Sequence, residues 1–358
     1  MSLRIMPKGA LKAWVTRLQS RQFKVVGPKS LHGQYIFDEI TDPNDLVLDY
    51  PTSVLPPKKF LLPPRETLFR FNARTMESHA EITVEPLIIF GVHTCDMHAI
   101  ALLDKVHNTG YADQHYKAHR AATYLVSIEC LKPCMEGSFC KSMGTLTVPE
   151  AFDLHLTDLG SDYAVDVGSE KGEELLEGFS SVWEPTESDY ERVNNVMAAK
   201  WPHFSYRLEC DVTELPDLLS ISQKSPLWDE LGERCLACGM CTKVCPTCYC
   251  FDVTDEIDLN LEKGERVRTW DSCQIEKFAV VAGGHNFRSS RALRQRHRFM
   301  RKGKYQYEAF GLMGCVGCGR CAAACLVHIT PVDTFNELYR MRQSAKAVPQ
   351  PQIKEPQP

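Results

Sequence analysis

Hydrophobic positions recur at helical spacing near the start of the chain. Pro7 is followed by Leu11, Trp14, Val15 and Leu18, which are three or four residues apart. Residues at this spacing share one side of a helix, and proline is well tolerated just before or at a helix start. The pattern predicts an amphipathic helix that packs against a core.

The clearest architectural pattern lies further along the chain. Residues 87–90 and 124–128 are short apolar runs typical of buried strands, and residues 96–106 between them have helical spacing. A strand, a helix and a strand in this order predict two parallel strands. Sites in such sheets lie beyond the carboxyl ends of the strands, and Cys95 and Cys130 follow those ends directly.

Other segments complete the expected fold. Residues 42–64 are rich in proline, which favours extended or turn backbone over helix, so we expect an ordered segment that wraps around the domain. The remaining predictions are a hairpin or pair of edge strands at 154–156 and 163–165 around Gly160, helices at 173–179 and 188–201, and a short helix opened by Pro226.

Composition adds one abnormality to an ordinary globular chain. The 358 residues are 44% hydrophobic and 24% charged, with a net charge of −5, but they include 16 cysteines. We find no secretion signal and no run of about 18 apolar residues that would span a membrane, so we expect a cytoplasmic protein. Because cytoplasmic thiols stay reduced, these cysteines indicate metal or redox chemistry rather than disulfides.

Eight cysteines have the spacing of bacterial ferredoxins. Cys235, Cys238, Cys241 and Cys245 form a C-x2-C-x2-C-x3-C run followed by proline, and the same spacing returns in Cys315, Cys318, Cys321 and Cys325. In such pairs the fourth cysteine ligates the other cluster. We therefore predict one [4Fe-4S] cluster on Cys235, Cys238, Cys241 and Cys325, and another on Cys315, Cys318, Cys321 and Cys245.

Two features qualify this assignment. Zinc bound by four thiolates is the alternative, but each run supplies four cysteines, and zinc ribbons do not need the third and fourth. Leu326 stands where proline usually follows the last cysteine, and Pro331 could turn the chain instead. Gly239 and Gly319 follow the second cysteine of each run, where we expect a side chain to crowd the cluster or its backbone donors.

A third group of cysteines is less regular. Cys130, Cys134 and Cys140 follow the second predicted strand, and Cys95 supplies a fourth thiol after the first. Four thiolates are what a cubane cluster needs, although free cysteines also serve as small buried hydrophobic residues. We predict a third [4Fe-4S] cluster here.

Four cysteines remain unassigned. Cys210 is isolated and we interpret it as structural. Cys248, Cys250 and Cys273 fit either of two hypotheses: they pack beside the first cluster with weak hydrogen bonds, or they hold a further metal.

A basic run lies between the two ferredoxin motifs. Its members are Arg288, Arg291, Arg294, Arg296, Arg298, Arg301, Lys302 and Lys304. Three interpretations stay open: a docking face for a partner subunit, positive charge that offsets the negative clusters, and a solvated helix face. The acidic net charge argues against a nucleic-acid partner, and no G-x-G-x-x-G, Walker, nucleophile-elbow or H-E-x-x-H motif is present, so we expect no nucleotide site and no catalytic residues.

Several motifs together resemble one subunit family. They are Gly91-Val92-His93-Thr94-Cys95-Asp96, the stretch Phe139 to Thr145, the Cys235 run continued by Pro246-Thr247-Cys248-Tyr249-Cys250-Phe251-Asp252, Trp270-Asp271-Ser272-Cys273, and the stretch Cys315 to Cys321. The family comprises the beta subunits of cytosolic NAD(P)-linked [NiFe] hydrogenases, called sulfhydrogenases, and the electron-transfer subunit of anaerobic sulfite reductase. The resemblance covers roughly residues 85–340.

The resemblance implies an electron-transfer subunit without catalysis of its own. Such a subunit links a flavin- and NAD(P)-binding subunit to the small and large subunits of a [NiFe] hydrogenase, or alternatively to a siroheme subunit that reduces sulfite. The family pattern around Cys95 supports its role as a ligand. Rival hypotheses are a zinc-stabilised scaffold without redox function and an independent enzyme that binds flavin itself.

We therefore predict an α+β protein in three parts. Residues 1–224 form an α/β domain with one cluster-binding loop, residues 225–342 form a helical dicluster ferredoxin-like domain, and residues 343–358 form a disordered tail.

Overall fold

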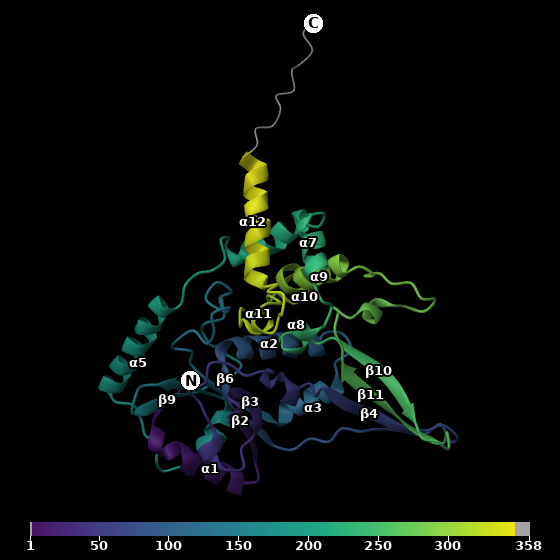
Figure 1. The fold of residues 1–358 in the computed structure, drawn as a ribbon. Coiled ribbons are helices and arrows are strands. Elements are labelled where there is room, and N and C mark those ends of the chain that lie inside the picture. The colour runs from purple at the N-terminus through teal and green to yellow at the C-terminus, as the bar shows by residue number, and fades with distance from the viewer. Residues whose placement is uncertain (1, 348–358) are drawn as a thin grey trace.

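The computed structural model describes residues 2–347 of the chain (Figure 1). The strands are β1 (Ser2–Pro7), β2 (Lys24–Leu31), β3 (Gln34–Glu39), β4 (Arg65–Asn72), β5 (Ser78–Ala80), β6 (Leu87–His93), β7 (Thr123–Ile128), β8 (Leu154–Asp158), β9 (Asp162–Val167), β10 (Phe251–Ile257) and β11 (Lys263–Trp270). The α-helices are α1 (Leu11–Ser20), α2 (Thr94–Asn108), α3 (Gln114–Ala122), α4 (Glu170–Leu176), α5 (Glu187–Lys200), α6 (Leu215–Ile221), α7 (Leu227–Arg234), α8 (Met240–Lys243), α9 (Arg291–Met300), α10 (Gln306–Phe310), α11 (Arg320–Ala323) and α12 (Pro331–Ala347). The α+β class is confirmed.

Short helical turns join several of these elements. They are η1 (Lys8–Ala10), η2 (Pro43–Asp45), η3 (Pro57–Phe60), η4 (Trp201–His203), η5 (Val212–Glu214), η6 (Glu276–Ala279) and η7 (Arg301–Tyr305), of which η7 is a π-helical turn between α9 and α10. None of the helices within residues 2–347 combines the length and the apolar composition that a membrane crossing requires.

A seven-stranded sheet forms the first half of the molecule, in the order β1-β9-β8-β7-β6-β2-β3. Its four central strands, β2, β6, β7 and β8, are parallel, and antiparallel strands complete both edges. The predicted strand, helix and strand at β6, α2 and β7 and the hairpin β8-β9 are confirmed. The carboxyl ends of β6 and β7 lie side by side, which brings Cys95 and Cys130 to one edge of the sheet.

Apolar side chains cover both faces of this sheet. Trp14, Val15 and Leu18 of α1 pack with α4 on one face, as the helical spacing predicts, and α2 and α3 cover the other. The proline-rich segment contributes Tyr50 and Leu61 to the second core. This segment is therefore the ordered wrapping element that the sequence analysis expected.

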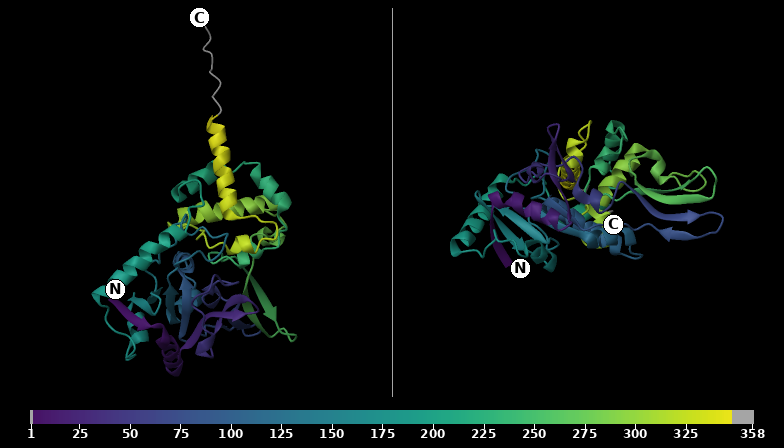
Figure 2. Two further views of the ribbon diagram at one scale, coloured as in Figure 1. Left: turned by 60° about the vertical axis from the view of Figure 1, so that its left-hand side comes forward. Right: turned by 90° about the horizontal axis from the view of Figure 1, so that it is seen from below.

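A separate helical core forms the second half. It joins α6, α7, α9 and α12 around Phe299 and Phe335, which are fully buried. The left view of Figure 2 shows these helices above the seven-stranded sheet, with α12 projecting from them. The core begins before the predicted boundary at residue 225, because the α6 leucines Leu215, Leu218 and Leu219 bury their side chains against it rather than against the sheet.

Strands from both predicted domains combine in a second sheet, in the order β10-β11-β4-β5. It extends away from the helices at the lower right of Figure 1. Arg268 of β11 anchors it, since its buried guanidinium pairs with Glu66 at 2.5 Å and with Asp113. The division at residues 224 and 225 is thus not a boundary in packing.

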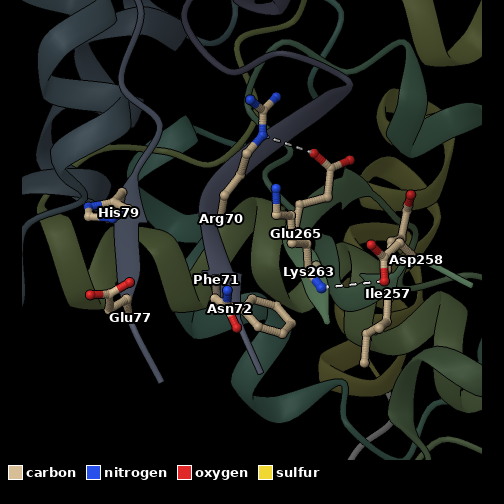
Figure 3. Close-up of a pocket in the computed structure, with 11 residues that line it drawn as sticks. Arg70, Phe71, Asn72, Glu77, His79, Ile257, Asp258, Lys263 and Glu265 are labelled. Atoms are coloured by element: carbon tan, nitrogen blue, oxygen red, sulfur yellow. Dashed lines mark hydrogen bonds and ion pairs between the residues drawn. The ribbon is translucent and has the colours of Figure 1, made fainter. Parts of the chain in front are cut away.

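An open groove of about 570 Å³ lies on this second sheet (Figure 3). Arg70 and Glu265 form an ion pair across it at 3.7 Å, and Phe71, Ile257 and Lys263 are among its other lining residues. None of its lining residues is a cysteine. The groove is therefore separate from the candidate chemistry.

The predicted disordered tail begins too early. Residues 343–347 continue α12, because the helix that starts at Pro331 is stabilised by its buried residues Val332, Phe335 and Leu338 and propagates beyond them. The rest of the predicted tail, residues 348–358, lies outside the described part of the chain.

Candidate metal centres

The two ferredoxin motifs fold in the same way. After the second cysteine of each, a glycine adopts a left-handed conformation, with φ of 77° at Gly239 and 79° at Gly319, and opens a four-residue helix, α8 or α11. A Cβ atom at Gly319 would lie 2.6 Å from the Met135 sulfur, and one at Gly239 would lie 3.0 Å from the Ser272 hydroxyl. A side chain at either position would therefore crowd its protein neighbours, which at Gly319 include the backbone of Gly137 and Ser138 at 2.9 Å.

The fourth cysteine of the first motif faces the second motif. Burial, and then the neighbouring thiols including Cys245, raise the pKa values of Cys315, Cys318 and Cys321. The Thr247 hydroxyl, 3.2 Å from the Cys245 sulfur, donates to the carbonyl of Gly314, next to Cys315, at 2.6 Å. Cys245 therefore lies on the side of the second motif, as ligation of the second cluster requires.

The fourth cysteine of the second motif lies toward the first. Arg234, next to Cys235, donates hydrogen bonds to the carbonyls of Val327 at 2.8 Å and His328 at 3.3 Å, directly after Cys325. Leu326, which replaces the usual proline, is 80% exposed. Pro331 begins α12.

Hydrogen bonds to sulfur are already in place in both motifs. The backbone N–H groups of Ala237 and Ile329 donate to the sulfurs of Cys235 and Cys325, each at 3.3 Å. The side-chain amide of Gln295 donates to the Cys235 sulfur at 2.8 Å and to the side-chain amide oxygen of Gln274 at 3.0 Å. Such donors stabilise negative charge on a ligating sulfur.

Buried cations beside these thiols indicate that a negative group belongs there. Arg298 and Lys302 are 4% and 8% exposed, and within residues 2–347 their side chains donate to neutral partners, Gln295 and Thr247. Burial lowers the pKa of each, but the thiols of Cys241 and Cys321 raise that of Arg298, and those of Cys245 and Cys248 raise that of Lys302, so that both net shifts are upward. An unpaired buried cation is costly, and thiolate-ligated clusters would neutralise both. The donor set and its surroundings therefore fit [4Fe-4S] clusters.

The structure shows that the buried residues of the basic run do not form a docking face. Arg294, Arg298 and Lys302 turn inward, where Arg294 donates to the carbonyls of Arg288 and Ser289. These three side chains do not form a docking face, because α9 packs that side against α7 and the cysteine loops. Arg298 and Lys302 lie beside the cysteines instead, where their positive charge would offset that of thiolate-ligated clusters.

The third group of cysteines also comes together. Cys95 lies in the first turn of α2 and Cys130 follows β7, and the hydroxyl of Thr94, next to Cys95, donates to the Cys130 sulfur at 3.7 Å. Burial, followed by the thiol of Cys134, raises the pKa of Cys140 to about 11, and burial also raises that of Cys130, with Cys134 adding to it. The four thiols thus line one region at the edge of the sheet.

This third region lies against the second ferredoxin motif. Phe139 N–H donates to the Gly317 carbonyl, and the Thr145 hydroxyl donates to the Val316 carbonyl, each at 2.7 Å. A Cβ at Gly317 would lie 2.7 Å from the backbone nitrogen of Cys140. The three cysteine groups therefore form a series in which the second motif is central.

A buried ion pair reinforces the same junction. Arg320, between Cys318 and Cys321, holds both carboxylate oxygens of Asp96 at 2.6 and 2.7 Å, and it also donates to the carbonyl and hydroxyl of Ser53. No pattern in the sequence predicts that Arg320 and Asp96 form a pair. The one signal that could have drawn attention to them is that each stands next to a cysteine in the chain.

The four unassigned cysteines separate into two kinds. Cys210 packs in the helical core, consistent with a structural role. Cys248, Cys250 and Cys273 line a small cavity together with Arg301 and Lys302. In the described residues 2–347, no three His, Cys, Asp or Glu side chains are grouped so as to hold a single metal ion.

Comparison with known proteins agrees with the geometry. Residues 234–329 match the family model of a 4Fe-4S dicluster domain. Over 317 residues, covering 88% of this chain and 92% of the relative, the sequence is 36% identical to Sulfhydrogenase 2 subunit beta of Pyrococcus furiosus. The chain belongs to the sulfhydrogenase beta subunit family. No solved structure matches it.

Membership has direct consequences for the chemistry. This sulfhydrogenase beta subunit homologue is an iron-sulfur electron-transfer subunit that binds [4Fe-4S] clusters. The dicluster match covers both ferredoxin motifs and ends before α12. It does not include Cys95, Cys130, Cys134 or Cys140, so the ligands of a third cluster remain a prediction.

Gln295 offers a first test of how this family member controls its clusters. Replacing Gln295 with leucine removes a donor to the Cys235 sulfur, and the reduced cluster, which carries more negative charge, should lose more stabilisation than the oxidised one. We expect the midpoint potential of the Cys235 cluster to fall by roughly 50 mV, taking about 1 kcal/mol for the bond. Potentiometric titration followed by electron paramagnetic resonance measures this. The Cys315 cluster is the internal control, and an unchanged potential at both clusters would contradict the assignment.

Proposed function

We propose that this subunit carries electrons through three [4Fe-4S] clusters between the catalytic subunits of a [NiFe] hydrogenase and a partner that binds flavin and NAD(P). The observation that carries the proposal is the contiguity of the three cysteine groups. Gly317 of the second motif packs against the backbone of Cys140 in the third region, and the Thr247 hydroxyl beside the Cys245 sulfur donates to the carbonyl of Gly314, next to Cys315 of the second motif. Clusters in this series would pass single electrons from one to the next.

The ligands of the three clusters follow the predicted sets. Cys235, Cys238, Cys241 and Cys325 would hold one, Cys315, Cys318, Cys321 and Cys245 the next, and Cys95, Cys130, Cys134 and Cys140 the third. The protein's own residues set burial, charge and hydrogen bonding around each set, while bond making takes place in the partner subunits.

Partner identity is transferred from the relative. The name Sulfhydrogenase 2 subunit beta describes one subunit of a larger enzyme, and we extend that assembly to this chain. Because thiolate-ligated clusters depend on reduced cysteines, we propose the cytoplasm as the compartment.

Anaerobic purification of the native complex tests the whole proposal. We expect about twelve iron and twelve sulfide per chain, the number that three cubane clusters require, together with a nickel-containing protein and released flavin on denaturation of the complex. About eight iron per chain would remove the third cluster from the proposal, and a co-purifying siroheme protein without nickel would replace the hydrogenase partners.

Cys140 isolates the third cluster. Replacing it with alanine should lower iron from about twelve to about eight per chain and leave the spectra of the dicluster pair unchanged, because Cys140 belongs to neither ferredoxin motif. The matched control is Cys210→Ala, which should keep all the iron because Cys210 packs in the helical core. Full iron content in the Cys140 variant would show that the third site is wrong.

A further inference from the structure

Two of the unassigned cysteines enclose the β10-β11 hairpin. Cys250 immediately precedes β10, and Cys273 follows β11 after two residues. The antiparallel ladder closes with Phe251 opposite Trp270, and Asp271 N–H donates to the Cys250 carbonyl at 2.9 Å. The ladder therefore holds the two cysteines together at the base of the hairpin, although 22 other residues separate them in the chain.

The side chains of this pair face the same space. Both line the small cavity described above. The side-chain amide of Gln274 donates to the Cys273 sulfur at 3.5 Å. Two thiols that line one small cavity, on backbone segments that a β-ladder joins, need only a small side-chain movement to form a bond between them.

The two thiols are not equivalent. Cys273 is 4% exposed, whereas Cys250 is only partly buried. The neighbouring Cys273 thiol lowers the pKa of Cys250 to about 6, with further lowering by the positive charges of Arg301 and Lys302, whereas the neighbouring Cys250 and burial raise the pKa of Cys273. A partly exposed thiolate beside a buried thiol is the usual asymmetry between the attacking and resolving cysteines of a dithiol site.

We propose that Cys250 and Cys273 form a thiol–disulfide exchange site for small-molecule disulfides. The Cys250 thiolate attacks one sulfur of the disulfide, forms a mixed disulfide and releases one thiolate, which takes up a proton. Cys273 then loses its proton and attacks the Cys250 sulfur, which releases the second thiol and leaves the Cys250–Cys273 disulfide. Two protein thiols are oxidised and one small disulfide is reduced to two thiols, so electrons and protons balance.

This role goes beyond electron transfer through the clusters and uses none of their twelve proposed ligands. It requires only that those ligands be occupied by iron while the pair remains free. The hairpin above the pair belongs to the second sheet, which projects from the rest of the molecule (Figure 1). The cysteine pair therefore lies at the junction between the first ferredoxin motif and that projecting sheet.

Oxidised glutathione is the probe. The anaerobically purified full-length protein with its clusters is treated with it, free thiols are blocked by alkylation, and peptides are mapped by mass spectrometry. We expect the wild-type protein to yield a peptide pair cross-linked between Cys250 and Cys273 that dithiothreitol separates. Cys273→Ser should instead retain glutathione on Cys250, and Cys250→Ser should show neither product.

Cys210→Ser is the matched control and should give the same cross-link as the wild type, because Cys210 lies in the helical core. A stable glutathione adduct on Cys250 of the wild-type protein, a cross-link to Cys248, or no reaction at either residue would each overturn the proposal. The wild-type measurement tests the proposal even if a variant does not fold. Iron analysis of the same sample separates the two proposals: low iron with reactive cluster cysteines counts against the clusters, whereas full iron with unreactive Cys250 counts against the exchange site.

Discussion

Replacing Cys245 with alanine should remove the cluster whose other ligands are Cys315, Cys318 and Cys321, and not the cluster of its own motif. The physical reason is that Cys245 is buried and faces the second motif, because the Thr247 hydroxyl beside its sulfur donates to the carbonyl of Gly314, next to Cys315. Iron should fall from about twelve to about eight per chain. Because the lost cluster is the central one of the series, electron transfer from one end of the subunit to the other should cease.

The identity of the lost cluster can be decided with Gln295. Its hydrogen bond of 2.8 Å to Cys235 marks the first cluster alone, so Gln295→Leu labels that cluster by its shifted potential. In the Cys245→Ala, Gln295→Leu double variant, the shifted signal should persist. In the Cys325→Ala, Gln295→Leu double variant it should disappear. The opposite pair of outcomes would mean that each motif holds its own cluster with its own four cysteines.

The second large effect is expected at the buried ion pair. Arg320 and Asp96 have side chains that are 2% and 1% exposed. Replacing Arg320 with leucine leaves a buried carboxylate without its partner, which costs about 3–5 kcal/mol. We expect a marked fall in the thermal midpoint of the anaerobically purified protein and loss of iron from the second and third sites, since the pair joins the loops that hold Cys318 and Cys95.

Two further variants make this prediction specific. Arg340→Leu breaks an exposed pair with Glu209, whose side chains are 57% and 39% exposed, and it should cost no more than about 1 kcal/mol. The double variant Asp96→Leu, Arg320→Leu should recover part of the lost stability, because no charge is then left buried and unpaired. If Arg320→Leu proves as stable as Arg340→Leu, the pair does not hold the junction.

The sequence predicted those helices and strands whose own apolar residues recur at regular spacing. The helix around Trp14 and Val15 and the parallel strands β6 and β7 followed from spacing and from short apolar runs, because each buries its own apolar face. The sequence analysis did not identify β10, although it forms a strand. All of its residues are exposed, so no burial pattern indicates it.

The second sheet was missed for a related reason. Its strands β4 and β11 pair only after the chain returns from the helical motif, for example with Phe71 opposite Gly264. Pairing of this kind depends on register between distant segments and on the anchoring of Arg268 by Glu66. Neither contribution has a local signature, and for this reason the predicted division into domains did not coincide with the packing.

The sequence by itself determined the ferredoxin motifs, because their cysteines are three or four residues apart and a short loop brings them together whatever the rest of the chain does. The relative and the dicluster match confirm the class of protein that they indicate. Only the tertiary structure decided what surrounds them: the inward-facing Arg298 and Lys302, the pair of Arg320 with Asp96 across 224 residues, and the meeting of Cys250 with Cys273. These contacts join segments that are distant in the chain, so they depend on how whole elements pack and not on the spacing within any one of them.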